Sequence, residues 1–507
     1  MISKKLKKRK ENCFLTRRRN DAKIKKIALC AFASLCLSVQ NINNMSSKTS
    51  EISDSKTKRI ILIIICLATF QTPFMGSALN LALPAIAKSF SLDAVAQSWI
   101  VSIYLLSSAI FAIPFAKSGD ILGRKKVFAG GVLTLLLASG ACIVSPSFLW
   151  FVIFRFLQGL GSAMIFATGM PVLISVFSPK ERGKILGINT SVVYFSAAAG
   201  PFLGGLLTEH FGWKSIFVLN ILVGLLILFG VFKGMRSMEW VESRKDKFDW
   251  RGVLIYASGL SALIYGFSKL PHICGFVLTG AGLLLLCLFG IYESKYKFPI
   301  FNVKLFIKNK IFRLSSFAAL INYAATFGIG YMLSLYLQHI KGYSAQAAGT
   351  ILIIQPVTQG IFSIVSGRLS DKINAAKLAT SGMALIVAAL LLMLLLDETT
   401  PLLFLTASLV ILGIGFAFFS SPNVNVIMSS VEKQHFGMAS ATTGTMRLVG
   451  QSFSMGVVAM ITSLVVGKIK ITAEVHVKLM ESIHITFIVF AILCAIGVYF
   501  SLARNKK

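Results

Sequence analysis

The first residues whose types and spacing could do chemistry are the charges of the segment SGDILGRKK, residues 118–126. Asp120 is followed by Gly123, which permits a tight backbone turn, and three consecutive basic residues come next: Arg124, Lys125 and Lys126. The chemistry that they offer is electrostatic. Positive charge would fix the orientation of a chain in a membrane, but that role does not need Asp120.

A second group of residues places charge inside apolar segments. Arg155 lies in such a segment, and Gln158 is three residues on, on the same helix face. A buried cation in a membrane span is costly and indicates a functional role; a snorkelling or structural hydrogen-bonded arginine is the alternative. Arg447 is a parallel case, for which reaching the membrane interface is the alternative.

Neutral polar residues also occur inside the apolar segments, and each either lines a cavity or bonds a neighbouring helix. They are Gln71, Asn80, Asn189, Tyr194, Asn220, Asn322, Tyr323, Gln355, Gln359, Asn423 and Asn425. Among 40 phenylalanines and 16 methionines, such groups suit amphipathic, largely apolar solutes.

Other kinds of chemistry find no support in the sequence. The eight cysteines are scattered without a CxxC spacing, which argues against a disulfide or metal framework. All nineteen acidic residues fall in loops or at span ends, whereas a membrane-embedded enzyme would cluster acidic residues or histidines within its spans. We therefore expect no metal, no cofactor and no enzymatic activity.

The elements that must position these residues are membrane helices. The chain of 507 residues is 55% hydrophobic and 14% charged, against roughly a quarter charged in soluble proteins. Apolar runs of about twenty residues, each long enough to cross a bilayer, predict an all-α polytopic membrane protein. Fourteen spans are expected, at residues 60–79, 98–116, 127–145, 149–173, 185–207, 214–232, 252–269, 273–292, 312–337, 347–367, 378–396, 402–422, 438–466 and 484–503.

The basic residues support this topology. When loops are assigned alternately to the two sides, one side holds thirty Lys and Arg from Lys48 onward and the other seven. This bias predicts that both termini are cytoplasmic. It also places the net charge of +32 in short loops, which argues against a nucleic-acid partner.

The chain begins with a basic extension, residues 1–58. Its first 44 residues carry twelve Lys and Arg and an apolar run, Ile27–Val39, that resembles a signal-peptide core. A cleaved signal would leave the mature N-terminus outside, against the charge bias. We therefore expect translation to start at Met45.

An internal repeat divides the rest of the chain. Asp120 and Asp371 are 251 residues apart, as are Pro171 and Pro422, and several glycine pairs repeat at offsets of 250 to 254. The repeat predicts two six-helix bundles, residues 59–232 and 311–507. The linker and two inserted helices, residues 233–310, separate them. A substrate path near the midplane, between the halves, is the expected arrangement.

Several motifs resemble one protein family. They are FMGSALNLALPAI in the first span, the 118–126 segment, FRFLQGLGSA in the fourth span and GINTSVVYFSAAAGPFLGGLL in the fifth. Together they resemble the fourteen-span drug:proton antiporter branch of the major facilitator superfamily (EmrB/QacA-like multidrug efflux transporters).

The resemblance implies roles for particular residues. It implies a cytoplasmic gating latch, formed by Gly119, Asp120, Gly123, Arg124 and Lys125 and by a second, degraded copy with Gly367, Arg368 and Asp371. It implies an antiporter element in the fifth span, with Gly187, Gly200, Pro201, Gly204 and Gly205. It also implies that Arg155 takes part in proton transfer or orients polar groups of the cavity.

One departure from the family concerns proton coupling. The position at which the branch carries an aspartate in its first span is Met75 here. The remaining titratable candidates are Asp120, Glu209, His210 and His484, and uncharged or anionic solutes are favoured over cations.

We expect a monomeric carrier of the cell membrane that exchanges protons for small amphipathic compounds and exports them. The alternatives are a metabolite carrier or facilitator without proton antiport and a non-transporting receptor.

Overall fold

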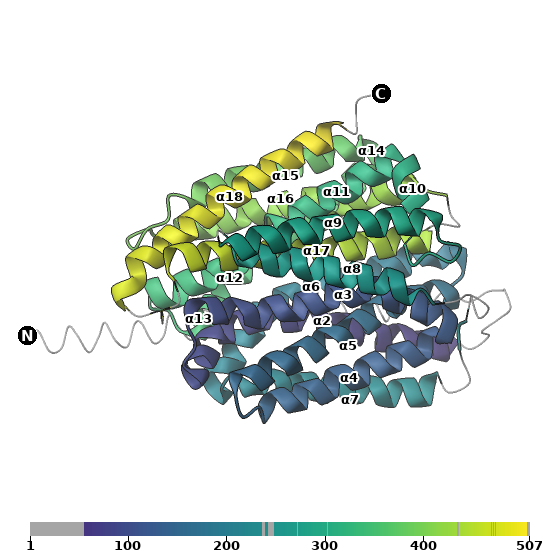
Figure 1. The fold of residues 1–507 in the computed structure, drawn as a ribbon, viewed down its shortest axis with the longest axis horizontal. Coiled ribbons are helices and arrows are strands. Elements are labelled where there is room, and N and C mark those ends of the chain that lie inside the picture. The colour runs from purple at the N-terminus through teal and green to yellow at the C-terminus, as the bar shows by residue number, and fades with distance from the viewer. Residues whose placement is uncertain are drawn as a thin grey trace, which may run out of the picture. The chain divides into compact units, whose positions relative to one another are not determined.

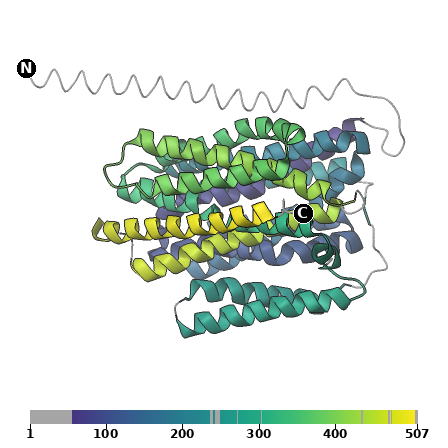
Figure 2. The same cartoon turned by 90° about the horizontal axis from the view of Figure 1, so that it is seen from above.

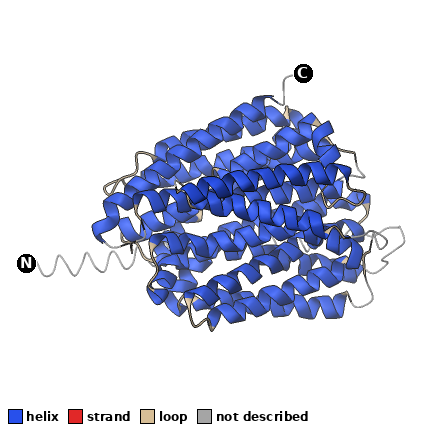
Figure 3. Cartoon of the chain, viewed as in Figure 1, coloured by secondary structure: helices blue, strands red, loops and turns tan. Residues whose placement is uncertain are grey.

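The computed structural model describes residues 55–503, apart from 236–238, 242–247, 271, 302, 433–435, 468, 470 and 472. The expectations for residues 1–54 lie outside this part of the chain. The chain divides into two units, Met1–Thr57 and Lys58–Lys507, and the helices below belong to the second unit from Lys58 onward. The described residues form helices, turns and loops without a β-strand (Figure 3).

The first half of the bundle consists of six long helices. They are α2 (Ser55–Phe90), α3 (Ala94–Leu122), α4 (Arg124–Ile143), α5 (Phe148–Val176), α6 (Pro179–Phe211) and α7 (Lys214–Gly234). Side chains close in sequence cap the N-termini of several of these helices. Asp93 accepts a hydrogen bond of 2.7 Å from the backbone N–H of Ala96, and Ser178 with Glu181 forms a capping box at the start of α6.

The predicted second half contains more and shorter helical segments. Its helices are α11 (Lys310–Ala324), α12 (Phe327–Leu335), η2 (Tyr336–Ile340), α13 (Ala345–Leu352), α14 (Ile354–Lys372), α15 (Ala375–Met393), α16 (Leu402–Ser429), α17 (Phe436–Val465), η4 (Ala473–Val475) and α18 (His476–Ala503). The sequence predicted single spans at 312–337 and 347–367, and each proves to be interrupted. In the first, Ala325 and Thr326 separate α11 from α12, and the π-helical turn η2 follows directly at the end of the span. In the second, Ile353 separates two helical pieces.

Between the halves lie α8 (Trp250–Ser268), α9 (Ile273–Lys295) and the short α10 (Val303–Lys308). Every predicted span falls on a helix, and the all-helical membrane fold is confirmed. Thirteen described helical segments are long and apolar enough to cross a membrane. Helix α8 is not among them, so the count of fourteen stays a prediction.

The halves meet through a few helix pairs. Helix α3 packs against α17, and α6 packs against α13 and α14. Helices α8 and α9 pack against each other, and α8 also contacts α3 and α17. In Figures 1 and 2 this pair, drawn in teal, runs along one side of the helices of both halves. The insertion therefore covers the seam between the halves on that side.

The connection between α3 and α4 is much shorter than the sequence suggested. Helix α3 continues through Asp120 to Leu122, and α4 begins at Arg124, so Gly123 alone separates them. Gly123 has φ +111°, a conformation that side chains rarely adopt. The segment expected as a loop is thus a sharp corner between two helices. We call the end of the bundle at this corner the basic end, and the end at which α6 finishes and α13 begins the opposite end.

Glycines allow the backbones of α8 and α9 to approach each other closely. A Cβ on Gly282 would lie 2.8 Å from the backbone oxygen of Gly259 and from Leu263 Cα, whereas a Cβ on Gly280 would meet nothing within 4 Å. We expect Gly282→Ala to destabilise the protein by about 1–3 kcal/mol, because backbone would have to move. Thermal unfolding of the purified protein in detergent measures the change.

Gly280→Ala is the matched control on the same helix, and we expect it to be neutral or slightly stabilising. Equal effects of the two substitutions would contradict the close α8–α9 contact.

Candidate functional site

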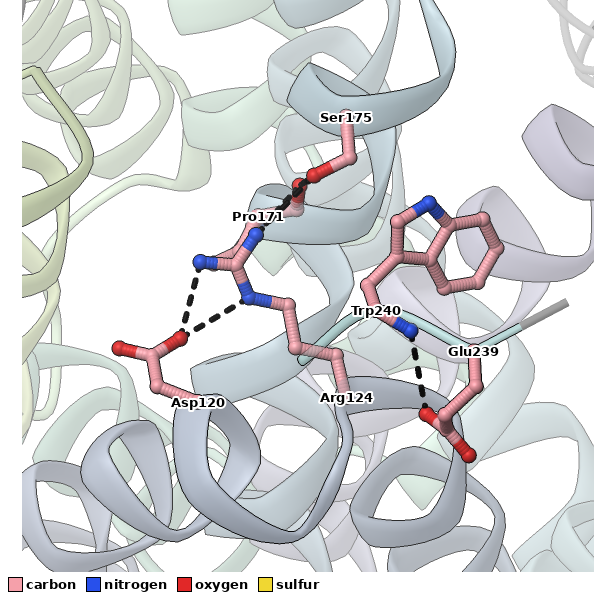
Figure 4. Close-up of polar contacts among 6 residues, drawn as sticks. All are labelled: Asp120, Arg124, Pro171, Ser175, Glu239 and Trp240. Carbon is pink, nitrogen blue, oxygen red and sulfur yellow. Dashed lines mark hydrogen bonds and ion pairs between the residues drawn. The ribbon is translucent and has the colours of Figure 1, made fainter. Parts of the chain in front are cut away.

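At the basic end, Asp120 and Arg124 form an ion pair. Arg124 donates to Asp120 Oδ1 from Nε at 3.0 Å and from Nη2 at 2.9 Å. The same guanidinium donates to Ser175 Oγ at 3.0 Å and to the Pro171 carbonyl at 3.4 Å, both on α5 (Figure 4). Arg124 is 7% exposed. These contacts of the pair hold α3, α4 and α5 together within the first half.

The linker between the halves docks on the same corner. The Lys125 backbone N–H donates to Glu239 Oε1 at 3.0 Å, and the Arg124 N–H donates to the Trp240 carbonyl at 2.9 Å. Figure 4 shows Glu239 and Trp240 beside the start of α4. The first N–H groups of a helix have no partner within it and favour negative charge. Glu239 therefore caps α4 from a position 114 residues away in sequence.

Sequence reasoning missed Glu239 because its role depends on this fold. Position 123, immediately before α4, is a glycine and offers no side-chain cap. A Cβ at Gly123 would lie 2.5 Å from the Glu239 carboxyl carbon. The glycine thus serves both the positive φ of the corner and the approach of the linker carboxylate.

The second copy of this segment differs. Helix α14 continues through Gly367 and Arg368 to Lys372, and α15 starts after Asn374, whose side chain accepts from the N–H groups of Ala376 and Lys377. Arg368 is exposed. The Asp371 side chain lies outside the described residues, so its predicted role stays a prediction.

A buried polar network lies deeper in the first half. Arg155 is fully buried and donates to Gln158 Oε1 at 2.7 Å and to the Ile100 carbonyl at 3.2 Å. Its guanidinium lies 4.5 Å from the centre of the Tyr104 ring, a favourable position for a cation over an aromatic face. Within the described residues Arg155 has no carboxylate partner. Hydrogen bonds and a ring hold this charge in place of a counter-ion.

The network continues through Ser139, which the sequence analysis did not single out. Both Gln158 Nε2 and Asn220 Nδ2 donate to Ser139 Oγ, at 2.7 Å and 2.6 Å. Gln71 Nε2 donates in turn to the Asn220 carbonyl at 2.6 Å. Four separately predicted polar residues thus belong to one array that joins α2, α3, α4, α5 and α7.

The network retains unused hydrogen-bonding capacity. Arg155 Nη2, Gln71 Oε1 and Asn220 Oδ1 are buried without a protein partner. Leaving such groups unsatisfied is costly, so they are places for a water molecule or a polar group to bind. Gln71 and Asn220 offer acceptors, and Arg155 offers a charged donor.

The glycines of α6 form close contacts both within the first half and between the halves. A Cβ on Gly200 would lie 2.8 Å from Ser77 Cβ, and one on Gly204 would lie 2.6 Å from Ala78 Cα, both on α2. A Cβ on Gly205 would lie 3.1 Å from Gln346 Cα on α13.

The second half also contributes a glycine to this contact. A Cβ on Gly349 of α13 would lie 2.9 Å from the carbonyl carbon of Pro201. Gly187 has nothing within 4 Å of a Cβ and takes no part in this packing.

Polar contacts close the same region at the opposite end. Glu209 Oε2 accepts from the Gln346 backbone N–H at 2.9 Å, and His210 Nε2 lies 3.2 Å from Gln346 Oε1. Ser334 Oγ donates to the Asn80 carbonyl at 2.8 Å. The two halves are therefore joined at the opposite end by close backbone packing and by hydrogen bonds.

The other predicted residues are placed as follows. Asn322 is fully buried, and both of its side-chain polar atoms have no partner. Three amides bond within the second half: Gln355 donates to Gln359 at 3.0 Å, Asn423 to the Ser315 carbonyl at 3.1 Å and Asn425 to Ser370 Oγ at 3.3 Å. Arg447 lies 4.8 Å from the centre of the Phe166 ring. The last contact crosses from α17 to α5, so Arg447 joins the halves instead of reaching only for the interface. The Tyr194 side chain lies outside the described residues.

Two further predicted features concern charge. Met75, at the position where the resembled branch has an aspartate, is fully buried. His484 Nε2 lies 2.8 Å from the Leu396 carbonyl. Among the described residues no three His, Cys, Asp or Glu side chains gather in a way that could hold a metal ion.

Comparisons with known proteins agree with this geometry. A family model described as the Major Facilitator Superfamily matches residues 65–453 and, in a second match, 315–507. The riboflavin transporter RibZ of Clostridioides difficile is 30% identical over 79% of this chain and 87% of its own. The multidrug resistance protein Stp of Mycobacterium tuberculosis is 27% identical over 84% and 79%.

Solved structures share the fold. A bacterial homologue of the human lysosomal transporter Spinster, in an inward-facing and unoccupied conformation, superimposes with a TM-score of 0.62 at 16% identity. The match covers 89% of this chain and 97% of that one.

The linker dock can be tested by a double substitution. We expect Gly123→Ala to destabilise the protein both through backbone strain and by displacing Glu239. In a Glu239→Ala background only the strain remains, so the penalty of Gly123→Ala falls by about 1 kcal/mol, the usual value of a helix cap. Unfolding of the four proteins in detergent measures this coupling.

Gly212 provides the control, because it also has a positive φ, +78°, but nothing within 4 Å of a Cβ. The penalty of Gly212→Ala is expected to be unaffected by Glu239→Ala. A Gly123→Ala penalty that is equally unaffected would rule out the dock.

Proposed function

The chain belongs to the major facilitator superfamily and is a multi-pass membrane transporter, and on this premise we propose that it exports small, largely apolar compounds by alternating access. The observation that carries the proposal is the packing of α6. Its glycines bring the backbone of α6 into direct contact with α2 in the first half and with α13 in the second, which forms a rigid surface about which two halves can rock.

The sidedness follows from charge. Thirty Lys and Arg on the side of the basic end against seven on the other side support a cytoplasmic basic end and cytoplasmic termini in the cell membrane. On this assignment the contacts of Glu209 and Gly205 with α13 close the outer side. The GPxxGG element at Gly200–Gly205, by its resemblance to exporters, supports outward transport.

The basic end would then carry the gate. We propose that the ion pair of Asp120 and Arg124 is the mobile part of a latch, held on α5 by Ser175 in this state and available to the second half when the outer side opens. The linker dock at Glu239 keeps the corner in place. Arg447, which already spans the halves through Phe166, supports a close approach of α17 to α5 in that movement.

The class of solute follows from the absence of acidic residues in the middle of the spans. All nineteen acidic residues lie in loops or near span ends. Met75, with an uncharged thioether, occupies the first-span position at which the resembled branch has an aspartate. A lipophilic cation would find no carboxylate partner there. Arg155 and the amides of Gln71, Asn220 and Asn322 instead offer hydrogen bonds to neutral or anionic heteroatoms.

A second candidate function is transport of a metabolite, and one comparison favours it. The relative at 30% identity is named a riboflavin transporter, and riboflavin is an uncharged, flat heterocycle of the class that this chemistry suits. Relatives named multidrug resistance proteins support the broader export function. Both candidates share the fold and the path and differ in selectivity and in proton coupling.

Transport in liposomes separates the two. We expect the reconstituted protein to move an uncharged amphipathic dye at least about tenfold faster than tetraphenylphosphonium, since an unpartnered cation is costly in the membrane interior. An imposed pH gradient should accelerate export if protons are exchanged. Transport of riboflavin that ignores the gradient would favour the metabolite carrier, and faster transport of the cation would contradict the proposed solute class.

The latch is tested by Asp120→Asn, which keeps the shape and removes the charge. We expect the initial transport rate to fall about tenfold, equivalent to about 1.4 kcal/mol in the barrier, with the protein still inserted and folded. Glu398→Gln, at an exposed loop residue, is the control and should transport normally. A wild-type rate for Asp120→Asn would remove the latch from the mechanism.

A further inference from the structure

Two carboxyl groups are buried together in the insertion between the halves. Asp249 precedes α8 and Glu293 lies in the last turn of α9, and each is 2% exposed. Asp249 Oδ1 accepts from the Gly252 N–H at 2.9 Å and from the Tyr292 hydroxyl at 3.1 Å. Glu293 Oε2 accepts from the Phe301 N–H at 3.3 Å. Each carboxyl thus uses one oxygen to hold a neighbouring segment.

The second oxygen of each group has no donor. Asp249 Oδ2 and Glu293 Oε1 are both buried without a hydrogen-bond partner. Both crowd the point at which a Cβ would stand on Gly252, which brings the two carboxyls to the same place. Two acceptor oxygens therefore face each other across a glycine that leaves them room.

We propose that Asp249 and Glu293 form a proton-binding site and share one proton at neutral pH. In the bound state one carboxyl O–H donates to the facing carboxylate oxygen, so a single proton satisfies both unpartnered atoms. Ionising both buried carboxyls would be costly, because each charge disfavours the other and burial disfavours both.

The surrounding groups favour a proton over a metal cation. The Tyr292 hydroxyl contacts Asp249 and lies near Arg251, while Tyr296, Lys297 and Lys304 line a cavity of about 180 Å³ of which Glu293 forms one wall. Lys297 and Lys304 would repel a bound metal ion. No basic group forms an ion pair with either carboxyl in the described chain. The cavity gives the pair a route to solvent for proton exchange.

The helices that pack against α8 bring few further charges. On α3 and α17 these are Lys117, Asp120 and Arg447, and Asp120 and Arg447 are engaged elsewhere, with Arg124 and with the Phe166 ring.

Proton binding here has a mechanical consequence. The shared proton holds together the start of α8, the end of α9 and, through Phe301, the segment that leads into α10 and the second half. Loss of that proton would place two like charges side by side and loosen this junction. The folded protein retains one proton more than the unfolded chain, in which both carboxyls are ionised at neutral pH, so stability falls as pH rises.

Infrared spectroscopy of the purified full-length protein tests the proposal directly. At neutral pH the wild type is expected to show the carbonyl stretch of a protonated carboxyl, sensitive to exchange into heavy water. Glu293→Gln, which mimics the protonated state, should lack the band while remaining folded, and Asp249→Asn should lack it as well. Glu481→Gln, at an exposed carboxyl of α18, is the control and should keep it.

The dependence of thermal unfolding on pH provides a second readout. We expect the wild type to lose stability as the pH rises from about 4, where carboxyls of the unfolded chain ionise, until the shared proton is released, with a slope corresponding to one proton more than in Glu293→Gln. Three results would each overturn the proposal: no protonated-carboxyl band in the wild type, a band that survives in both variants, or stabilisation by sodium or calcium salts that exceeds the effect of a matched potassium salt. The test does not depend on which solute the protein carries.

Discussion

Close approach of helix backbones is the constraint on which this structure depends. Within a bilayer, helices gain little from burying apolar side chains, because lipid is equally apolar, so association relies on packing and on hydrogen bonds. Helix α6 shows the result: Gly204 admits α2 on one side and Gly205 admits α13 on the other. One helix thereby ties the first half internally and joins it to the second.

The same environment makes polar groups expensive and therefore few. Where they occur they are gathered: Arg155 is held by Gln158, by the Ile100 carbonyl and by the Tyr104 ring, and the array reaches Gln71 through Ser139 and Asn220. The carboxyls of Asp249 and Glu293 reduce the cost of buried charge in another way, since a shared proton removes the need for a counter-ion.

The insertion and the linker are more than spacers. Glu239 caps α4 beside the Asp120–Arg124 pair, and Phe301, just before α10, is held by Glu293. The segment between the halves is thus attached at its start to the corner of the first half and at its finish to the insertion.

The sequence by itself determined the membrane class and located the helical segments on which the predicted spans fall, because hydropathy and charge bias act locally and are written along the chain. It also predicted a repeat of two six-helix halves. It also identified Arg155, Gln158, Gln71 and Asn220 as unusual. Only the tertiary structure decided that these four belong to one array, that two spans are broken, and that a glutamate 114 residues away caps α4. It alone paired Asp249 with Glu293, which in sequence are an ordinary cap and an ordinary span end. Such facts depend on which helices become neighbours, and a single sequence carries no direct signal for contacts between residues that are distant along it.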